Sequence, residues 1–540
     1  MKTEADRNGA DSPYLRYVQK HSHRHPSLKL LRDLPEVPQH PTRIKILEFR
    51  GDGVDNVDFN KVAQLEAYWS ATAAASTDCK GRLYLVEDIS LPYISSFGLR
   101  FNIDPRFFVE YLNFDPDRNQ NFLSGYHPMR RLTSLRNQTD FATFVYHEIR
   151  AFSGTAPRRE DYEIRTMTNV PRLLTTVDHH SGRFTGLVRR NLSVWRRPSQ
   201  GNDKPWDVVI LADPAASDRF TIRNWKKMAW TSISCQSSPY LEGYLDFTSW
   251  PPPQEDVSLP DYPSQHRSML DDIARYWCGA SPLDLKLAEQ DPSYSPIFAY
   301  RIVAAHWNLQ LEYLVPVVSN LEKGLLKFEQ MDAHPHAESI NNEVSALRVL
   351  LSDVNSWRRR VYFYLEQMKW NIEVLGLPHG GVMERIIGMD EEECEEKVPH
   401  PCRDPRKRQE RDANMLAATD FHAILISLRL TQQRIQSLLP VVMGAFSLLE
   451  AQHSVLKADL TIRLTSVALV FVPLSFTASV LSMSEDFIPG KRLFWVYFVV
   501  SAPMIIALFW WAYWVQLGSL KRRMAGKFWR AKLGREAKED

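Results

Sequence analysis

The sequence predicts an α+β multi-domain membrane protein: a cytoplasmic mixed α/β domain, long coiled-coil-like stalk helices and two C-terminal transmembrane helices. Three observations carry this prediction. Short β-type runs are interspersed with helical patterns in the first half of the chain. Apolar residues then recur in steps of three and four over long stretches. Two uncharged apolar segments stand near the C-terminus.

The composition excludes several classes of function. The chain has 540 residues and a formal net charge of +2. Because a nucleic-acid protein is expected to show a basic excess or a basic stripe, we expect no nucleic-acid partner. The 5 cysteines are scattered and never form a C-x-x-C pair, which indicates neither a disulfide framework nor a zinc ribbon. No hydrolase, metalloprotease or nucleotide-binding motif occurs, so we expect neither an enzyme nor a cofactor.

The first residues, 1–40, are polar and rich in His, Arg and Pro, which predicts a disordered tail. They contain no apolar core, so we expect no cleaved secretory signal. His21, His23 and His25 leave two interpretations, a weak metal site or a solvated tail, and we favour the tail.

Residues 41–244 form the expected α/β domain. Its β-type runs are RIKILEF, RLYLVED, ATFVYHEI, RFTGLVRRNLSVW and WDVVILAD. Asp104 followed by Pro105 predicts a helix start, because the carboxylate caps backbone N–H groups and proline at the first helical position loses no bond. Phe108, Tyr111 and Leu112 then give that helix one buried face.

A proline-rich stretch marks residues 245–296 as a linker and surface segment, and residues 297–463 as a helical stalk. A flexible charged loop is expected near residues 388–411. Its Cys394, His400 and Cys402, beside a cluster of acids, leave a metal site open, but the prolines and like-charge blocks favour a loop. Apolar seams over the predicted stalk helices are Val344, Leu347, Leu351, Val354, Val361, Leu365, Met368, Ile372 and Leu375, and then Leu428, Ile435, Leu439, Val442, Phe446, Leu449, Leu456 and Leu460.

Residues 464–483 and 493–515 are the predicted transmembrane helices. Neither contains a charged residue, and about 20 residues of helix cross the hydrocarbon core of a bilayer. Residues 484–492 hold a Pro-Gly turn and form the external loop. The basic tail, residues 516–540, places both chain ends in the cytoplasm by the positive-inside rule. We expect this two-pass hairpin in the lipid bilayer of the plasma membrane rather than of an organelle.

One face of the first predicted span is small or polar towards the outside and apolar towards the cytoplasm. Its members are Ser482, Ser479, Ser475, Val472, Ala468, Leu464 and Thr461. A pore wall needs hydroxyl groups where an ion is partly coordinated and an apolar ring that gates by dewetting, for which Leu464 is the candidate. Two other interpretations stay open. Ser475 and Ser479 form a small-residue packing motif, and serine hydroxyls in membrane helices often bond their own backbone.

The acids Glu485 and Asp486 follow the span at its outer end. Rings of acidic residues concentrate cations at the mouth of a channel. An ordinary loop beside Lys491 and Arg492 explains the two acids equally well.

The first-span sequence RLTSVALVFVPLSFTASVLSMS resembles that of the CorA family of divalent-cation transporters, and most of all its divergent fungal branch. The family pattern is Leu-Thr, an apolar stretch, Pro-Leu-Ser/Thr-Phe and a closing Gly-Met-Asn. The stretch FGLRFNIDPRFFVEYL is more loosely similar to a helix-Asp/His-Pro-helix stretch of the family's cytoplasmic domain. Aligned from Pro473, the closing triplet falls on Ser482, Met483 and Ser484, so only the methionine is kept.

The resemblance implies a homo-oligomer, a pentamer by analogy, whose first spans surround an axis. It implies passive transport of a divalent cation, Mg²⁺ or another, and the heptad seams would supply contacts between subunits. In the family an asparagine ring contacts the hydrated ion, and a serine hydroxyl is shorter and less dipolar than an amide. The alternative is a non-conducting membrane-anchored scaffold or sensor with the same architecture. No residue is assigned as a direct metal ligand.

Overall fold

The computed structural model describes residues 12–32, 34–35, 38–51, 53–74, 79–112, 140–154, 162–180, 183–197, 205–224, 229–247, 268–329, 337–375, 405–482 and 495–510. The chain divides into two compact units. The first unit combines residues 1–322 with 354–437, and the second combines 323–353 with 438–540.

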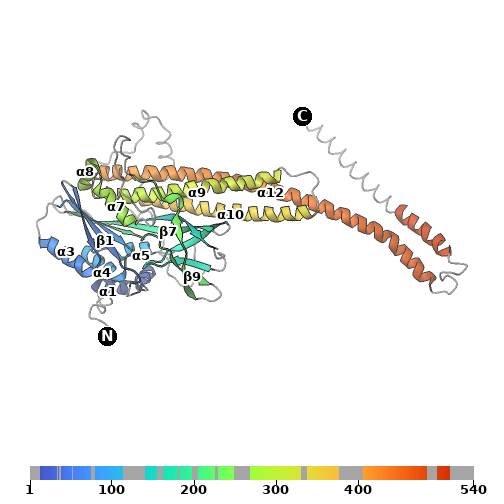
Figure 1. Cartoon of the computed structure of the whole chain (residues 1–540), viewed down its shortest axis with the longest axis horizontal. Helices are drawn as coiled ribbons and strands as arrows, with labels where there is room; N and C mark the ends of the chain where they lie inside the picture. Colours follow the sequence, from blue (N-terminus) through green and yellow to red (C-terminus); the bar gives the residue numbers. More distant parts are fainter. Residues whose placement is uncertain are drawn as a thin grey trace, which may run out of the picture. The chain divides into compact units, whose positions relative to one another are not determined.

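Among the described residues of the first unit, 11 strands form one sheet (Figure 1). The strands are β1 (Arg43–Arg50), β2 (Gly53–Phe59), β3 (Gly81–Glu87), β4 (Phe141–Ser153), β5 (Tyr162–Thr166), β6 (Leu173–His180), β7 (Arg183–Arg196), β8 (Trp206–Ala212), β9 (Arg219–Asn224), β10 (Trp230–Ser234) and β11 (Ser237–Pro239). The predicted β-type runs lie in β1, β3, β4, β7 and β8. The remaining strands are short or polar and gave no clear alternation in the sequence.

Strand β7 joins the two halves of this sheet. One of its edges pairs with β4, from Arg183 opposite Ser153 to Trp195 opposite Phe141. Its other edge is shared, since β6 pairs with its first half and β8 with its second. The sheet continues from β8 through the parallel strand β3 to β1 and β2, and from β6 through β5 and β9 to β10.

One side of the sheet is covered by short helices and an aromatic core. The helices are α1 (Pro13–His21), the 3₁₀ turn η2 (Pro26–Leu28), α2 (Lys29–Arg32), α3 (Val62–Ala74), α4 (Leu91–Phe101) and α5 (Pro105–Leu112). Phe97 and Phe107 are fully buried in this core. The Trp69 ring meets the Phe97 ring edge-on, with centroids 5.3 Å apart, a preferred geometry for aromatic pairs.

Residues 13–32 belong to this core, so the predicted disordered tail is wrong over that range. Tyr14 and Val18 are one helical turn apart and both are buried, and the Tyr14 hydroxyl donates to the Ile103 carbonyl at 2.8 Å. The polar composition hid a short amphipathic helix whose apolar residues are few but correctly spaced. Residues 1–11 lie outside the described residues.

The predicted helix start at Asp104 is confirmed. Helix α5 begins at Pro105, and the Asp104 carboxylate accepts a hydrogen bond from the backbone N–H of Arg106 at 2.9 Å. The expected face is buried, with Phe108 and Tyr111 at 0% exposure. The local rule for capping therefore predicted where this helix begins.

The predicted linker, residues 245–296, is wrong over its second half. Helices α7 (Met269–Cys278) and α8 (Pro282–Gln290) form there. The Trp277 side chain is buried and lies 4.9 Å from the Phe49 ring of β1. The proline-rich stretch ends before the amphipathic helix α7, which packs on the sheet. Residues 248–267 lie outside the described part of the chain.

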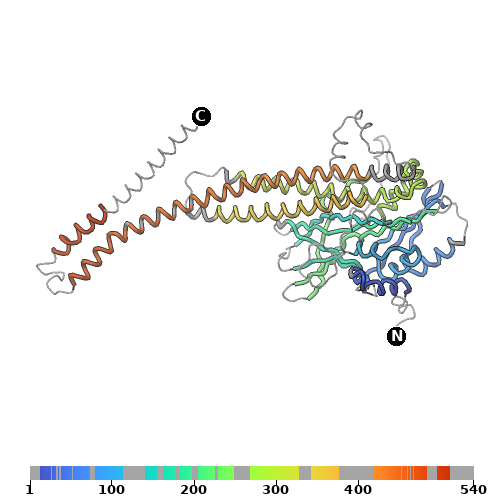
Figure 2. The backbone as a smooth tube through the Cα atoms, turned by 180° about the vertical axis from the view of Figure 1, so that it is seen from behind, coloured from blue at the N-terminus to red at the C-terminus, as the bar shows by residue number. Residues whose placement is uncertain are grey.

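Three long helices follow, α9 (Ile297–Glu329), α10 (Ala337–Val374) and α12 (Pro405–Leu481). Within the first unit their residues 297–322, 354–374 and 405–437 run side by side along the other side of the sheet (Figures 1 and 2). The expected fold class, a mixed α/β domain with long helices, is therefore confirmed. Since α12 begins at Pro405, the predicted charged loop is helical over its last residues, and residues 388–404 lie outside the described range.

Side chains of the long helices close the edge of β4 that faces away from β7. The Asn371 carboxamide accepts from the Val145 N–H at 3.1 Å and donates to the Val145 carbonyl at 2.9 Å. These are the two bonds that a neighbouring strand would make. The Trp307 indole donates to the same carbonyl, and the Trp370 indole to the Thr143 carbonyl, both at 3.1 Å. Buried backbone groups at this edge are thus satisfied by α9 and α10.

Candidate ion pathway on the apolar helix

Among the described residues, one helical stretch is long and apolar enough to cross a membrane, Ala417–Leu481 within α12. Only 12% of its most apolar window is buried, whereas the core helix of a soluble domain would be mostly buried. A shorter apolar helix, Trp495–Trp510, follows it. The first predicted span, residues 464–483, therefore lies at the end of α12.

The predicted stripe is exposed along its whole described length, from Leu464 to Ser482. Leu464 is 72% exposed and Val472 is 66% exposed. By contrast, Pro473 and Thr477 are buried. At about 100° per residue, the stripe lies on roughly the opposite side of the helix from these two buried residues.

The buried side of the helix contacts the following apolar helix. The Thr477 hydroxyl lies 2.9 Å from the Ser501 hydroxyl, and the Tyr497 hydroxyl donates to the Leu474 carbonyl at 3.3 Å. Thr477 is 5% exposed and Ser501 is 2% exposed. This pair was not predicted from the sequence. The sequence feature that could have predicted the pair is a hydroxyl residue in each apolar segment, because such side chains form hydrogen bonds between membrane helices.

The hydroxyl groups of the stripe differ in their bonding. Thr461 donates to the Lys457 carbonyl at 2.8 Å, and Ser482 to the Ser479 carbonyl at 2.9 Å. Within the described part of the chain, the hydroxyls of Ser475 and Ser479 have no hydrogen-bond partner. The hydroxyls at the two ends of the stripe, on Thr461 and Ser482, are therefore bonded to backbone carbonyls of their own helix. The hydroxyls of the two serines between them are available to a ligand or a neighbouring helix.

Four of the predicted site residues, Met483, Ser484, Glu485 and Asp486, lie outside the described residues. Their roles stay predictions.

Most described residues of the apolar seams are buried inside this single chain, although Leu460 is 62% exposed. Leu428, Ile435 and Val442 of α12 are at most 1% exposed, and so are Val354 and Val361 of α10. These positions were expected to join subunits. Because they pack within the chain, another surface must serve any contact between copies.

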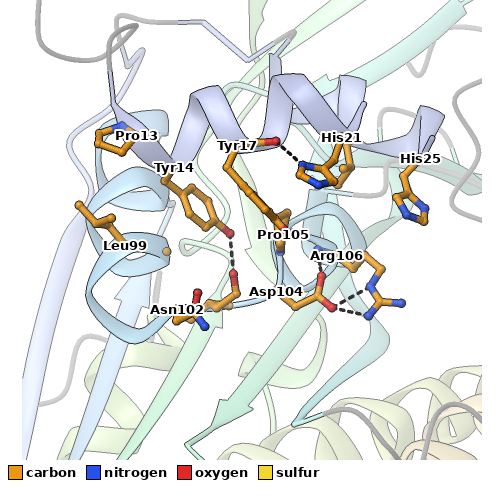
Figure 3. Close-up of a pocket in the computed structure, with 13 residues that line it drawn as sticks. Pro13, Tyr14, Tyr17, His21, His25, Leu99, Asn102, Asp104, Pro105 and Arg106 are labelled. Atoms are coloured by element: carbon orange, nitrogen blue, oxygen red, sulfur yellow. Dashed lines mark hydrogen bonds and ion pairs between the residues drawn. The ribbon is translucent and has the colours of Figure 1, made fainter. Parts of the chain in front are cut away.

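A groove of about 540 Å³ in the first unit holds part of the histidine triplet (Figure 3). His21 and His25 line it together with Tyr17, and Arg106 pairs with Asp104 at 2.8 Å between Nε and Oδ2. The His21 Nδ1 atom lies 2.8 Å from the Tyr17 carbonyl. No group of three or more His, Cys, Asp or Glu residues that could hold a metal is found in the part of the chain that the structure describes.

The first unit also buries a charged network. The guanidinium of Arg172 donates to both carboxylate oxygens of Asp213, at 2.8 and 2.7 Å. The Tyr111 hydroxyl donates to the same carboxylate at 2.7 Å, and the Asn191 N–H at 2.8 Å. All polar groups of this carboxylate have partners, which is the condition for burying a charge at moderate cost.

Two other buried acids respond to their surroundings in opposite ways. Burial would raise the pKa of Glu148, but the guanidinium groups of Arg190 and Arg150 outweigh it and lower that pKa to about 2. Burial raises the pKa of Asp88 to about 7, although the backbone N–H groups of Asn169 and Val170 oppose the rise. Structural packing within the first unit explains both groups.

Residues 398–522 match the family model described as CorA-like Mg²⁺ transporter protein. The matched range includes the apolar end of α12 and the apolar helix that follows it. No curated protein matches the chain.

Two solved structures are similar to this chain at low identity. The complete structure of the CorA magnesium transporter from Methanocaldococcus jannaschii shares 9% identity, covers 86% of this chain and 96% of its own, and has a TM-score of 0.33. The full-length CmaX protein shares 11% identity, covers 87% and 95%, and has a TM-score of 0.33. At that TM-score neither likeness supports an argument about this chain.

The assignment to the family therefore rests on the matched residues 398–522. The assignment to its fungal branch stays a prediction. Members of the family are transporters, which confirms the prediction that this chain is not an enzyme. The resemblance of the first span is confirmed at the level of the family model: the C-terminal residues 398–522 of this chain match a CorA-like Mg²⁺ transporter.

Proposed function

We propose that this chain is one subunit of a homo-oligomeric channel that moves divalent metal cations passively across a membrane. A CorA-like family implies transport of such ions, and Mg²⁺ is the ion in the family's description. The end of α12, residues 464–483, lines the pore. The ion is a cargo, so the site needs no resident metal.

The observation that carries this proposal is the placement of the stripe. The stripe residues are exposed on the side of the helix away from Thr477 and Ser501, which hold the hairpin together. A two-span subunit cannot enclose a path by itself, so a pore must lie between copies arranged around an axis. The exposed stripe is the surface that would face such an axis.

The chemistry of the stripe fits a hydrated cation. Mg²⁺ gives up its water reluctantly, so it is best recognised through its hydration shell by neutral oxygen atoms. The hydroxyls of Ser475 and Ser479 are without partners among the described residues and can accept from such water. Leu464, at the cytoplasmic end, supplies an apolar ring that closes by dewetting. A divalent ion gains roughly 4.6 kcal/mol per 100 mV of membrane potential, twice the value for one charge.

The finer features belong to the same proposal. Five subunits, a second span at residues 493–515, both termini in the cytoplasm and a plasma-membrane location follow from the resemblance and the charge pattern. Glu485 and Asp486 would concentrate cations at the outer mouth. Ser482, Met483 and Ser484 stand where the family's selectivity triplet is expected.

A second candidate is a non-conducting membrane-anchored scaffold or sensor. The observation that favours it is the sequence Ser-Met-Ser at residues 482–484, where the family pattern closes with Gly-Met-Asn. Losing the amide ring would remove the strongest neutral oxygen ligand for the hydrated ion.

Flux measurements on the purified chain in liposomes separate the two candidates. A channel gives uptake of Mg²⁺, Zn²⁺, Co²⁺ or Ni²⁺ that grows with an inside-negative potential. Intact oligomers without flux of any of these ions would leave the scaffold as the function. With flux present, Ser484→Asn should change the order of ion preference.

The gate is tested by Leu464→Gly. We expect a basal leak at least tenfold above that of the unchanged chain, because a smaller residue admits water to the constriction. Val480→Gly is the matched control, since Val480 is also exposed but lies off the stripe. Equal leak through both variants would remove Leu464 from the pathway.

A further inference from the structure

The groove between α1 and the corner that joins α4 to α5 has a different chemistry at each of its two ends (Figure 3). Pro13 and Leu99 lie at one end, and His21, His25 and Arg106 lie at the other. Leu99 is 58% exposed although it is large and apolar. The volume of about 540 Å³ is within the range of small-molecule sites, about 300–1,000 Å³. The groove can therefore hold a whole small molecule rather than a single ion.

One wall of the groove is a row of side chains on α1 and the turn that follows it. Pro13, Tyr17, His21 and His25 stand at steps of four residues, and all four line the groove. Residues four apart lie on one face of a helix. The Tyr17 side chain is 51% exposed. Along this wall the groove therefore changes from an apolar ring to an aromatic ring and then to imidazole groups.

The segment that forms this wall is strongly basic. Residues 13–32 contain no Asp or Glu, and their Lys and Arg residues are Arg16, Lys20, Arg24, Lys29 and Arg32. Among the described residues that line the groove, Asp104 is the one acid, and it is paired with Arg106. Since no other carboxylate of the lining opposes these charges, the basic end of the groove should attract an anion.

The Arg106 guanidinium is held in position with one nitrogen left free. Its Nε atom donates to Asp104 Oδ2 at 2.8 Å, and its Nη2 atom donates to the same oxygen. The Asp104 carboxylate is fixed in turn, because it caps α5 through the backbone N–H of Arg106. Within the described residues, the Nη1 atom has no hydrogen-bond partner. This nitrogen can donate to an oxyanion without a rearrangement of the side chain.

The two histidines add free nitrogen atoms at the same end. The His21 Nδ1 atom is bonded to the Tyr17 carbonyl, which leaves its Nε2 atom to the groove. The His25 ring has no hydrogen-bond partner in the part of the chain that the structure describes. A neutral imidazole has one N–H donor, so His25 offers a second donor beside Arg106.

Close packing fixes α1 against α4, so the groove is formed before any ligand binds. The Tyr14 hydroxyl donates to the Ile103 carbonyl at 2.8 Å. A Cβ atom added to Gly98 would lie 2.4 Å from the Tyr14 ring. The glycine therefore lets the two helices approach closely. A preformed site binds more tightly than one that must first become ordered.

We propose that this groove binds a small amphiphilic anion, a molecule with a carboxylate or phosphate head and an apolar, aromatic body. The head accepts hydrogen bonds from Arg106 and His25, and the body packs against Tyr17 and Leu99. An inorganic ion would leave the apolar end of the groove empty, and a neutral apolar molecule would leave the basic end without an acceptor. The groove belongs to the first unit, so the inference goes beyond the proposed ion channel and does not depend on it.

Saturation-transfer NMR of the full-length chain with phenyl phosphate tests the proposal. Inorganic phosphate carries the head alone, and benzyl alcohol carries the aromatic body alone. The affinity of each of these two molecules is measured by its displacement of phenyl phosphate. We expect phenyl phosphate to bind at least tenfold more tightly than either, because it alone contacts both ends of the groove.

Two variants separate the ends of the groove. Arg106→Gln should weaken the binding of phenyl phosphate at least tenfold and leave that of benzyl alcohol unchanged. The fold should be kept, because Asp104 still caps α5 in this variant. Leu99→Ser should weaken phenyl phosphate and leave inorganic phosphate unchanged. Arg100→Gln is the matched control, since Arg100 is also exposed and lies near the end of α4 but does not line the groove.

Three results would overturn the inference. They are the absence of saturable phenyl phosphate binding by the unchanged chain, equal affinity for phenyl phosphate and inorganic phosphate, and equal binding by the Arg106→Gln and Arg100→Gln variants. None of these measurements involves ion flux. A chain that binds phenyl phosphate as expected but conducts no ion would keep the groove and remove the channel.

Discussion

The two units of this chain differ in where they place charged and apolar side chains. In the first unit, Asp213 and Arg172 are almost fully buried and bonded to each other. In the second unit, Leu464 and Trp510 are both 72% exposed, while Thr477 and Ser501 are buried. The first unit buries this charged pair with each member bonded to the other. The second unit places apolar groups outside and joins its helices through hydroxyl groups.

The difference indicates what each unit is surrounded by. Water favours the arrangement of the first unit, because burying apolar side chains stabilises the fold. An ion pair can be buried in such a fold when both of its members are hydrogen-bonded. A lipid or protein environment favours the arrangement of the second unit. Lipid is as apolar as leucine, and it offers polar groups no hydrogen-bond partner. Packing inside the chain accounts for the first unit, whereas the exposed apolar faces of the second fit the lipid and the further copies that the proposed function requires.

The largest effect is expected where the first unit buries a charge. Asp213→Asn leaves the Arg172 guanidinium buried without its counter-charge, so we expect a loss of about 3–5 kcal/mol. Hydrogen exchange of β7 and β8 in the full chain measures it.

Glu322→Gln is the control for that change. The Glu322 carboxylate pairs with Arg434 at 2.9 Å, but both side chains are partly exposed. Exposed pairs contribute about 0–1 kcal/mol. A similar loss from both variants would show that burial does not decide the cost.

A smaller effect is expected at the edge of β4. Asn371→Leu removes the acceptor of the buried Val145 N–H, which should cost about 1–3 kcal/mol. The readout is faster exchange of the Val145 amide in the full-length chain.

Gln367→Leu is a close control for this edge, one helical turn before Asn371. The Gln367 side chain is 7% exposed, and its amide has no hydrogen-bond partner in the described structure. Replacing it should be neutral or stabilising, because no bond is lost. If Gln367→Leu is as harmful as Asn371→Leu, the carboxamide does not act as a substitute strand.

The stability of the first unit should also depend on pH. The folded pKa of Asp88 is raised to about 7 by burial, so its contribution to stability is present below the unfolded value near 4 and is lost as the pH rises to about 7. At about 1.4 kcal/mol per pKa unit, this rise corresponds to a loss on the order of 4 kcal/mol over the whole range.

Asp88→Asn should abolish this decline, and asparagine tolerates the positive φ of 53° at this position. Urea midpoints of the first unit at pH 5 and pH 8 test it. The variant should be the less stable protein at pH 5, because it loses an acceptor, and the gap should narrow at pH 8. A constant gap would contradict the assignment to Asp88, since Glu87 and Asp213 are the same in both proteins.

The smallest effect is expected between the two apolar helices. Thr477→Val and Ser501→Ala each remove one side of the hydroxyl contact. Their coupling in a double-mutant cycle should be near 0.6 kcal/mol, the average for such bonds in membranes. Ser479→Ala is the control, because that hydroxyl lies on the exposed stripe. Zero coupling between Thr477 and Ser501 would show that apolar packing alone joins the hairpin.

The elements predicted correctly were those specified by neighbouring residues. The Asp104-Pro105 start of α5 follows from capping, and the strongest β-runs follow from alternation. The errors have a different cause. Tyr14 and Val18 are apolar residues in a polar segment, and their helix is stabilised by a core that forms from distant parts of the chain. Composition could not show that.

By itself the sequence determined that this chain has long apolar helices, a CorA-like C-terminal segment and a stripe of serines on its first predicted span. Those features depend on residue type and on spacing along one helix, which are local. Only the tertiary structure decided which helix faces are already covered. It assigned most residues of the heptad seams to packing within the chain and Thr477 to the hairpin, and it left the serine stripe exposed. Burial depends on what lies across from a side chain, and no single helix contains that information.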